Sequence, residues 1–181
     1  MEASLLLAIH AHAGPVLDGL FILSHGLGIF WFCTPLVLLV ASWHRSRGEK
    51  QAAQVWILVG LSTLVFEEVV KPLVARPRPE LWPRLVAADS FSFPSGHALA
   101  SATFYPLLAW DLTRDRSRRV RALALAAGVV LSLFIGFGRL YLGVHWPTDV
   151  VAGWTIGAAQ TAVAIRHLQR IRSPGPGPRG V

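Results

Sequence analysis

The chain has 181 residues, of which 53% are hydrophobic and only 15% are charged, and its mean hydropathy is +0.49. So apolar a composition excludes an ordinary soluble domain and indicates a polytopic membrane protein. The net charge of +7 does not indicate nucleic-acid binding, because the basic residues fall in short clusters between apolar runs. The single cysteine, Cys33, excludes an internal disulfide and belongs to no metal-binding pattern.

The first part of the chain predicts an interfacial helix and one spanning helix. Residues 2–13 are weakly apolar and too short to cross about 30 Å of hydrocarbon, so we expect them to lie at the interface. The first spanning run lies within residues 15–43, and Pro15 is placed to begin a helix. His25 falls inside this run. We favour a histidine hydrogen-bonded within the bundle, with a functional role as the alternative.

A second apolar run covers residues 51–70. We expect it to end at Lys71, because Pro72 biases the residue before it away from helix. The connector that follows, residues 72–93, is rich in proline and has no helical period. Such a segment is typical of a structured or lid-like loop, and loops on a rigid scaffold often carry function.

Three further apolar runs follow the connector: residues 95–112, 120–137 and 147–165. A short loop, residues 138–146, joins the last two. Within the last run, Gly153 and Gly157 lie one turn apart, which permits close helix packing. Pro94-Ser95-Gly96-His97 opens the first of these runs, with proline placed in the first helical turn. Such a helix N-terminus is suited to receive an anion.

These patterns predict an all-α fold, a polytopic membrane bundle of about five transmembrane helices plus the interfacial helix. We expect a single integral-membrane domain over residues 1–172 and a disordered tail over residues 173–181, which are low in complexity. A soluble helical bundle is disfavoured, because the apolar runs of about 18–25 residues are separated by charged links.

The basic residues predict the sidedness of the bundle. Twelve of the 17 lie in links on one side: Arg45, Arg47, Lys50, Arg114, Arg116, Arg118, Arg119, Arg121, Arg166, Arg170, Arg172 and Arg179. The other five lie on the opposite side: Lys71, Arg76, Arg78, Arg84 and Arg139. The positive-inside rule therefore places the larger set in the cytoplasm. The N-terminus, the connector and the 138–146 loop then face outward.

The outward segments hold a set of residues suited to phosphate chemistry. Lys71, Arg78 and Arg139 are permanent cations that match a multiply charged anion, and backbone N–H groups around Ser95 and Gly96 would complete a cradle.

His145 and Asp149 are four residues apart, so the carboxylate can orient one ring nitrogen and leave the other free to attack phosphorus. His97 can supply acid–base catalysis. The alternative is that these are separate interfacial residues, which requires every one to gather on one membrane face by accident.

Three motifs occur in order: Lys71, six residues, Arg78-Pro79; then Pro94-Ser95-Gly96-His97; then Gly138-Arg139, five residues, His145, three residues, Asp149. Together they resemble the three-part signature of the type 2 phosphatidic acid phosphatase superfamily. That superfamily includes membrane lipid phosphatases and vanadium-dependent haloperoxidases. Each motif alone is weak, but the ordered set over residues 71–149 is specific.

The resemblance implies that His145 is the nucleophile, Asp149 its partner and His97 the acid–base residue. It also implies a set of phosphate-binding residues: Lys71, Arg78, Ser95, Gly96 and Arg139. No metal or other cofactor is expected. One departure is Gly138, where the family commonly has serine, so a hydroxyl contact is lost.

Two carboxylates precede the first motif. Glu67 can pair with Lys71 at i, i+4, and a structural pair that orients Lys71 is favoured over a catalytic acid. Glu67 and Glu68 are also placed to select substrate at the membrane mouth.

The sequence therefore predicts an integral membrane lipid phosphatase that acts through a phosphohistidine. Expected substrates are headgroups of the phosphatidic acid, phosphatidylglycerophosphate or undecaprenyl diphosphate type. We expect a bacterial inner (plasma) membrane protein with its active site outward, its C-terminus cytoplasmic and lipids as its partners, without nucleic acid. The oligomeric state and the particular lipid stay open. The alternatives are a haloperoxidase, disfavoured by the membrane spans, and a non-enzymatic anion- or lipid-binding or transport protein.

Overall fold

The computed structural model describes residues 1–28 and 30–172, and this part of the chain contains helices and no strands. The expected disordered tail, residues 173–181, lies outside the described residues. In chain order the elements are α1 (Glu2–His10), α2 (Pro15–Gly28), α3 (Phe30–Ser46), α4 (Lys50–Val65), the π-helical turn η1 (Phe66–Val70), α5 (Lys71–Val74), α6 (Gly96–Thr113), α7 (Arg118–Tyr141) and α8 (Pro147–Arg172). The prediction of an all-α fold is confirmed.

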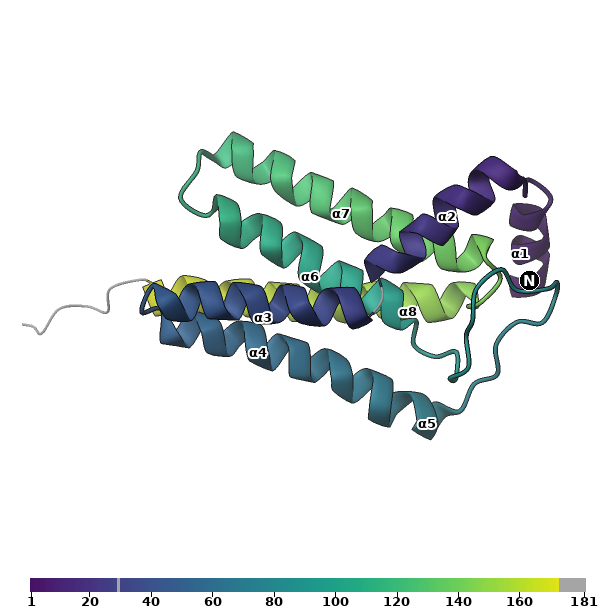
Figure 1. Cartoon of the computed structure of the whole chain (residues 1–181), viewed down its shortest axis with the longest axis horizontal. Coiled ribbons are helices and arrows are strands. Elements are labelled where there is room, and N and C mark those ends of the chain that lie inside the picture. Colours follow the sequence, from purple (N-terminus) through teal and green to yellow (C-terminus); the bar gives the residue numbers. More distant parts are fainter. Residues whose placement is uncertain (29, 173–181) are drawn as a thin grey trace, which may run out of the picture.

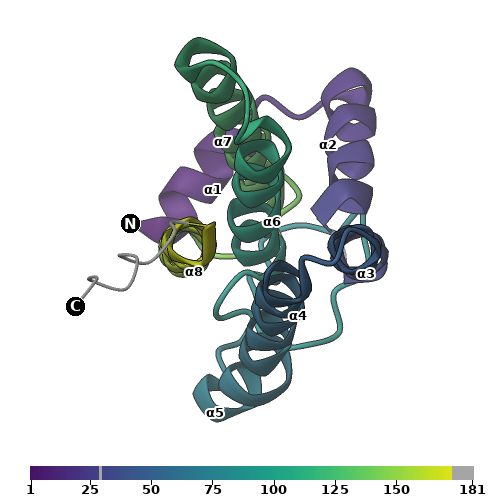
Figure 2. The same cartoon turned by 90° about the vertical axis from the view of Figure 1, so that its left-hand side faces the viewer.

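Helix α6 forms the centre of the bundle, with α3, α4, α7 and α8 around it (Figures 1 and 2). Glycine lets α8 approach α6 closely: a Cβ on Gly153 would lie 2.6 Å from the Ser95 carbonyl oxygen, and one on Gly157 would lie 2.6 Å from that of Leu99. The prediction of close packing at these two positions is confirmed. Since α6 begins within the Pro94-Ser95-Gly96-His97 motif, this packing fixes that motif against α8.

The helices depart from the predicted runs in three places. The run within residues 15–43 is divided into α2 and α3, which point in different directions (Figure 1). Helix α7 extends to Tyr141, so Arg139 lies on its last turn and not in a loop as predicted. Helix α6 begins at Gly96 with Ser95 as its N-cap, so Pro94 precedes the helix.

The predicted end of the second run at Lys71 is wrong, because the helix continues to Val74. The reason is the π-turn η1, in which the Lys71 N–H bonds to the carbonyl of Phe66, five residues back. The wider turn makes room for the Pro72 ring, which would clash with the preceding turn of a regular α-helix. The helix stops at Ala75, which takes a left-handed conformation with φ 48°.

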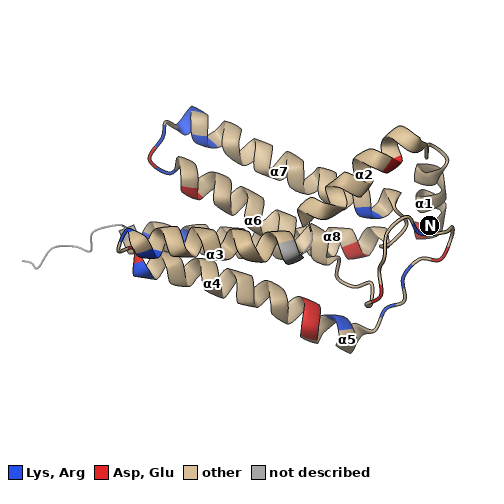
Figure 3. Ribbon diagram, in the orientation of Figure 1, with Lys and Arg blue, Asp and Glu red and all other residues tan. Residues whose placement is uncertain are grey.

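Charged residues gather at the two ends of the bundle (Figure 3). One group surrounds the α3–α4 and α6–α7 links, and the other lies near α5 and the 75–95 connector. Among the described helices, α7 alone is long and apolar enough to cross a membrane unaided, and the bent pair α1–α2 adds a second if it counts as one span.

A buried network of charges ties three helices together at the end far from α5. The His44 side chain is fully buried and contacts two carboxylates, Glu49 at 2.6 Å and Asp111 at 2.5 Å. Asp111 also accepts hydrogen bonds from Trp56 at 2.9 Å and from Arg114 at 2.7 Å. The network therefore links α3, α4 and α6 through the buried side chains of His44, Trp56 and Asp111.

Candidate active site

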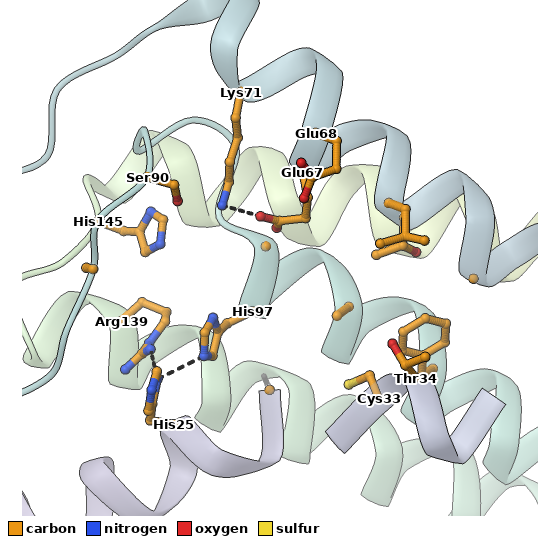
Figure 4. A pocket seen from close by; sticks show the side chains of 18 of the residues that line it. His25, Cys33, Thr34, Glu67, Glu68, Lys71, Ser90, His97, Arg139 and His145 are labelled. Atoms are coloured by element: carbon orange, nitrogen blue, oxygen red, sulfur yellow. Dashed lines mark hydrogen bonds and ion pairs between the residues drawn. The ribbon is translucent and has the colours of Figure 1, made fainter. Parts of the chain in front are cut away.

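Three segments that are distant in sequence meet at one cavity of about 680 Å³. They are the α5 region, the start of α6, and the stretch from the end of α7 into the loop before α8. Figure 4 shows Lys71, His97, Arg139 and His145 converging on the cavity from different elements. The polar residues that line it include Lys71, Arg78, His97, Arg139 and His145. The structure thus brings together the residues that the sequence motifs selected.

His145 and Asp149 form the pair that the i, i+4 spacing predicts. His145 Nδ1 lies 3.6 Å from Asp149 Oδ2, an ion-pair distance rather than a hydrogen bond. Asp149 is fully buried, and its carboxylate is held on several sides. Oδ2 accepts hydrogen bonds from the Ser92 hydroxyl and, at 2.8 Å, from the Trp146 backbone N–H, and Oδ1 pairs with Arg76 at 2.5 Å. The carboxylate is therefore fixed independently of the histidine.

The other ring nitrogen of His145 faces a cation. Arg78 Nη1 donates to His145 Nε2 at 3.0 Å and to the Val144 carbonyl at 2.7 Å. The rest of the guanidinium is held by Ser90 and Phe91 of the connector. Because arginine only donates, Nε2 is the acceptor and the ring proton lies on Nδ1, toward Asp149. This tautomer leaves the Nε2 lone pair on the side of the cations.

His145 is buried, and its surroundings favour the neutral ring. Burial lowers the pKa of His145 to about 3, and the cations Arg78, Lys71 and Arg139 lower it too, against the opposing effect of Asp149. A neutral imidazole at physiological pH keeps a lone pair on one ring nitrogen, which a nucleophile requires, and here that nitrogen accepts the hydrogen bond from Arg78.

Arg139 offers unused donors inside the protein. It is 1% exposed, and only its Nη1 is bonded, to His25 Nδ1 at 2.6 Å. Its Nε and Nη2 have no hydrogen-bond partner among the described residues, and the same holds for the hydroxyl of Ser95. Buried polar groups are normally paired, so such open donors in a cavity indicate a place for an anion.

His25 lies beside the motif residues in the same cavity, although it belongs to none of the three motifs. Its Nδ1 accepts from Arg139 and also lies 2.9 Å from His97 Nε2 (Figure 4). Since Nδ1 is already an acceptor, His97 Nε2 must be the donor, which places a proton on that nitrogen. The prediction of a histidine hydrogen-bonded within the bundle is confirmed. Its two partners, His97 and Arg139, both line the cavity.

The cradle at the start of α6 differs in part from the prediction. The Ser95 backbone N–H donates to the Asp149 carbonyl at 3.0 Å, so it is not free for an anion.

Glu67 forms the predicted ion pair with Lys71. Gly138 has a structural reason for the missing serine, because a Cβ there would lie 2.7 Å from Ser24 Oγ.

Two residues of the site gave no distinct signal in the sequence. Arg76 appeared only as one of five outward cations, yet it joins Asp149 to Glu2 of α1, which it contacts at 2.7 Å. Ser92 was not selected at all. Both act on Asp149 across more than 55 residues of chain, a distance over which a motif spacing carries no information.

Comparisons with known proteins agree with this geometry. Residues 51–173 match the family model of the PAP2 superfamily. The chain is 33% identical to phosphatidylglycerophosphatase B of Bacillus subtilis over 72% of its own length and 65% of that protein's, just under two thirds. It is 27% identical to an undecaprenyl-diphosphatase of Sulfolobus acidocaldarius, over 88% of this chain and 73% of that one.

A solved structure shows the same fold. The crystal structure of a transmembrane PAP2-type phosphatidylglycerolphosphate phosphatase from Bacillus subtilis superposes with a TM-score of 0.86 at 26% identity. The alignment covers 95% of this chain and 86% of that one.

Proposed function

Because the chain belongs to the PAP2 superfamily, we propose that it is an integral membrane lipid phosphatase that acts through a phosphohistidine. The proposed substrates are phosphomonoester or diphosphate headgroups of the phosphatidic acid, phosphatidylglycerophosphate or undecaprenyl diphosphate type. The observation that carries the proposal is the pair of open, buried donors on Arg139, in a cavity that also contains His145. The names of the two relatives, one a phosphatidylglycerophosphatase and one an undecaprenyl-diphosphatase, support this class of substrate.

The proposed reaction has two steps. His145 Nε2 attacks phosphorus, the bond to the lipid oxygen breaks, and that oxygen takes a proton from His97, which enters this step as the imidazolium and leaves it as the neutral ring. A water molecule then gives a proton to His97 and attacks the phosphohistidine, which breaks the P–N bond and releases phosphate. Asp149 stabilises the positive charge that develops on His145, and the cations stabilise the phosphoryl oxygens.

The shape of the cavity supports an amphiphilic substrate. From its charged end the cavity continues between α3, α4 and α6, where apolar side chains line it: Val37, Leu38, Ile57, Leu61 and Phe104. A phosphate headgroup matches the charged end of the cavity, and an acyl or isoprenoid chain matches this apolar part. A soluble phosphate ester would leave the apolar part of the cavity unfilled.

We place the bundle across a bacterial inner (plasma) membrane as one domain, with the site outward and the C-terminus in the cytoplasm. The distribution of Lys and Arg supports this orientation. Large apolar side chains also face outward from the bundle, including Leu39, Leu58 and Val130. In this arrangement α2 and α3 together make the first of five spans, and α1 lies at the interface.

The test is a phosphate-release assay of the purified protein against a panel of lipid monophosphates and diphosphates, with and without a chelator. We expect release that survives the chelator and is inhibited by vanadate, which mimics the transition state. Binding of these lipids without any release would instead favour a non-enzymatic anion-binding or transport protein.

Arg139→Lys is expected to lower kcat/KM about 10²–10³-fold, because lysine keeps the charge but cannot supply two parallel donors to the developing charge. Arg84→Lys is the matched control, since Arg84 pairs with Glu80 on the connector. Steady-state kinetics on a lipid monophosphate measure both. Equal losses in the two variants would contradict the role of Arg139.

His25→Leu is expected to lower kcat about 10–10²-fold on lipid substrates, because His97 loses the acceptor that orients its ring. The loss should be smaller on p-nitrophenyl phosphate, whose leaving group needs no proton. A comparison of the two substrates in the wild type and the variant measures this difference. A uniform loss on both would show that His25 does not act through His97.

A further inference from the structure

Glu67 lies at the phosphate-binding corner of the proposed site. Its carboxylate forms an ion pair with Lys71, whose side chain is only 6% exposed (Figure 4). It also lies against the start of α6, because a Cβ on Gly96 would come within 1.5 Å of Glu67 Oε1. Both the lysine and the helix start that would bind the substrate's phosphate are therefore already in contact with an anion.

The contact with α6 is favourable for a negative charge. Gly96 is the first residue of α6, an 18-residue helix. The first N–H groups of a helix have no helical partner, and the positive end of the helix dipole attracts anions. A carboxylate in this position lies where the helix start favours the same negative charge that a phosphate oxygen carries.

The π-turn η1 belongs to this arrangement. Glu67 and Glu68 both lie on it, but Glu67 is part-buried beside Lys71 while Glu68 is exposed. π-turns are rare and frequently occur at functional sites. The neighbouring carboxylate thus provides a matched comparison, on the same turn and lining the same cavity.

We propose that Glu67 is a built-in competitor of the substrate's phosphate. Its carboxylate holds Lys71 and the start of α6 in the ligand-free protein, and a phosphate dianion binds by displacing it. After hydrolysis, the Glu67 carboxylate binds Lys71 and the start of α6 again and so displaces inorganic phosphate from the site. This inference rests on the proposed function for the identity of the anion.

The competing explanation is that Glu67 only orients Lys71 for the substrate. The two explanations predict opposite signs. If Glu67 competes, its removal tightens phosphate binding, because Lys71 and the helix start become free. If Glu67 only orients Lys71, its removal weakens phosphate binding, because the lysine loses its position.

The experiment is a calorimetric titration of inorganic phosphate into purified wild-type protein, Glu67→Gln and Glu68→Gln. We expect Glu67→Gln to lower Kd about tenfold, since a repelling and competing charge is removed, and Glu68→Gln to change it less than about twofold. Glu67→Ala should shift Kd in the same direction, and thermal unfolding reports whether each variant is folded. An unchanged or raised Kd in folded Glu67→Gln would overturn the proposal, as would an equal gain in Glu68→Gln.

The titration needs no turnover, so it separates this inference from the proposed function. If the wild type releases no phosphate from any lipid while Glu67→Gln binds phosphate more tightly, the proposed function fails and the competitor role stands. If the wild type is an active phosphatase and Glu67→Gln binds phosphate no better, the competitor role fails alone.

Discussion

Replacing His145 with alanine is expected to lower phosphate release by at least about 10⁴-fold, because the proposed nucleophile is lost. The surrounding structure holds Asp149 through Ser92, Trp146 and Arg76, so the carboxylate keeps its partners in the variant. The protein should therefore remain folded and still bind phosphate. Phosphate release from a lipid monophosphate measures the loss.

Two further measurements make this prediction specific. Brief reaction of the wild type with a ³²P-labelled substrate, quenched in alkali, should trap label on the protein, and His145→Ala should trap none. His12→Ala is the control, because His12 is exposed on the turn after α1 and the one side-chain hydrogen bond described for it is to the Ala8 carbonyl. Turnover near the wild-type rate in His145→Ala would remove His145 as the nucleophile.

Replacing Asp111 with alanine is expected to lower the free energy of unfolding by about 3–5 kcal/mol, the usual cost of breaking a buried charge network on one side. The substitution leaves His44, Trp56 and Arg114 without a shared acceptor in a place that water does not reach. Reversible unfolding in mixed micelles, followed by tryptophan fluorescence, measures the change.

Asp115→Ala provides the control for this effect. Asp115 also contacts Arg114, at 3.3 Å, but its side chain is 86% exposed. An exposed ion pair contributes little, so we expect a change within about 0.5 kcal/mol. Similar small changes in both variants would show that the network at this end does not hold α3, α4 and α6 together.

The motif residues could be selected from the sequence because each motif combines characteristic residue types within a few positions of one another. The four-residue step from His145 to Asp149 keeps the two side chains close across the start of α8. The small residues Gly153 and Gly157 likewise predicted close packing, because the absence of a side chain has the same meaning in any helix pair.

The remaining features depend on contacts that spacing does not encode. The helix passes Pro72 because η1 widens the turn before it, and no local propensity distinguishes a π-turn from an ordinary end. His25 contacts His97 and Arg139 from the last turn of α2, and the sequence does not show that the run within residues 15–43 divides into α2 and α3. Arg76 meets Asp149 through the path of an irregular connector, which follows from tertiary packing alone.

The hydrogen bond from Arg78 to His145 Nε2 affects how readily His145 reacts in the protein without substrate. The Nε2 lone pair, which would attack phosphorus in the proposed reaction, accepts a hydrogen bond from the Arg78 guanidinium. We therefore expect small electrophiles that modify exposed histidines to react slowly with His145. Arg78 is also a proposed ligand of the phosphoryl oxygens, so the arrival of substrate draws away the group that caps the nucleophile. Under the proposed function, the same side chain would keep His145 unreactive in the absence of phosphate and release it when phosphate binds.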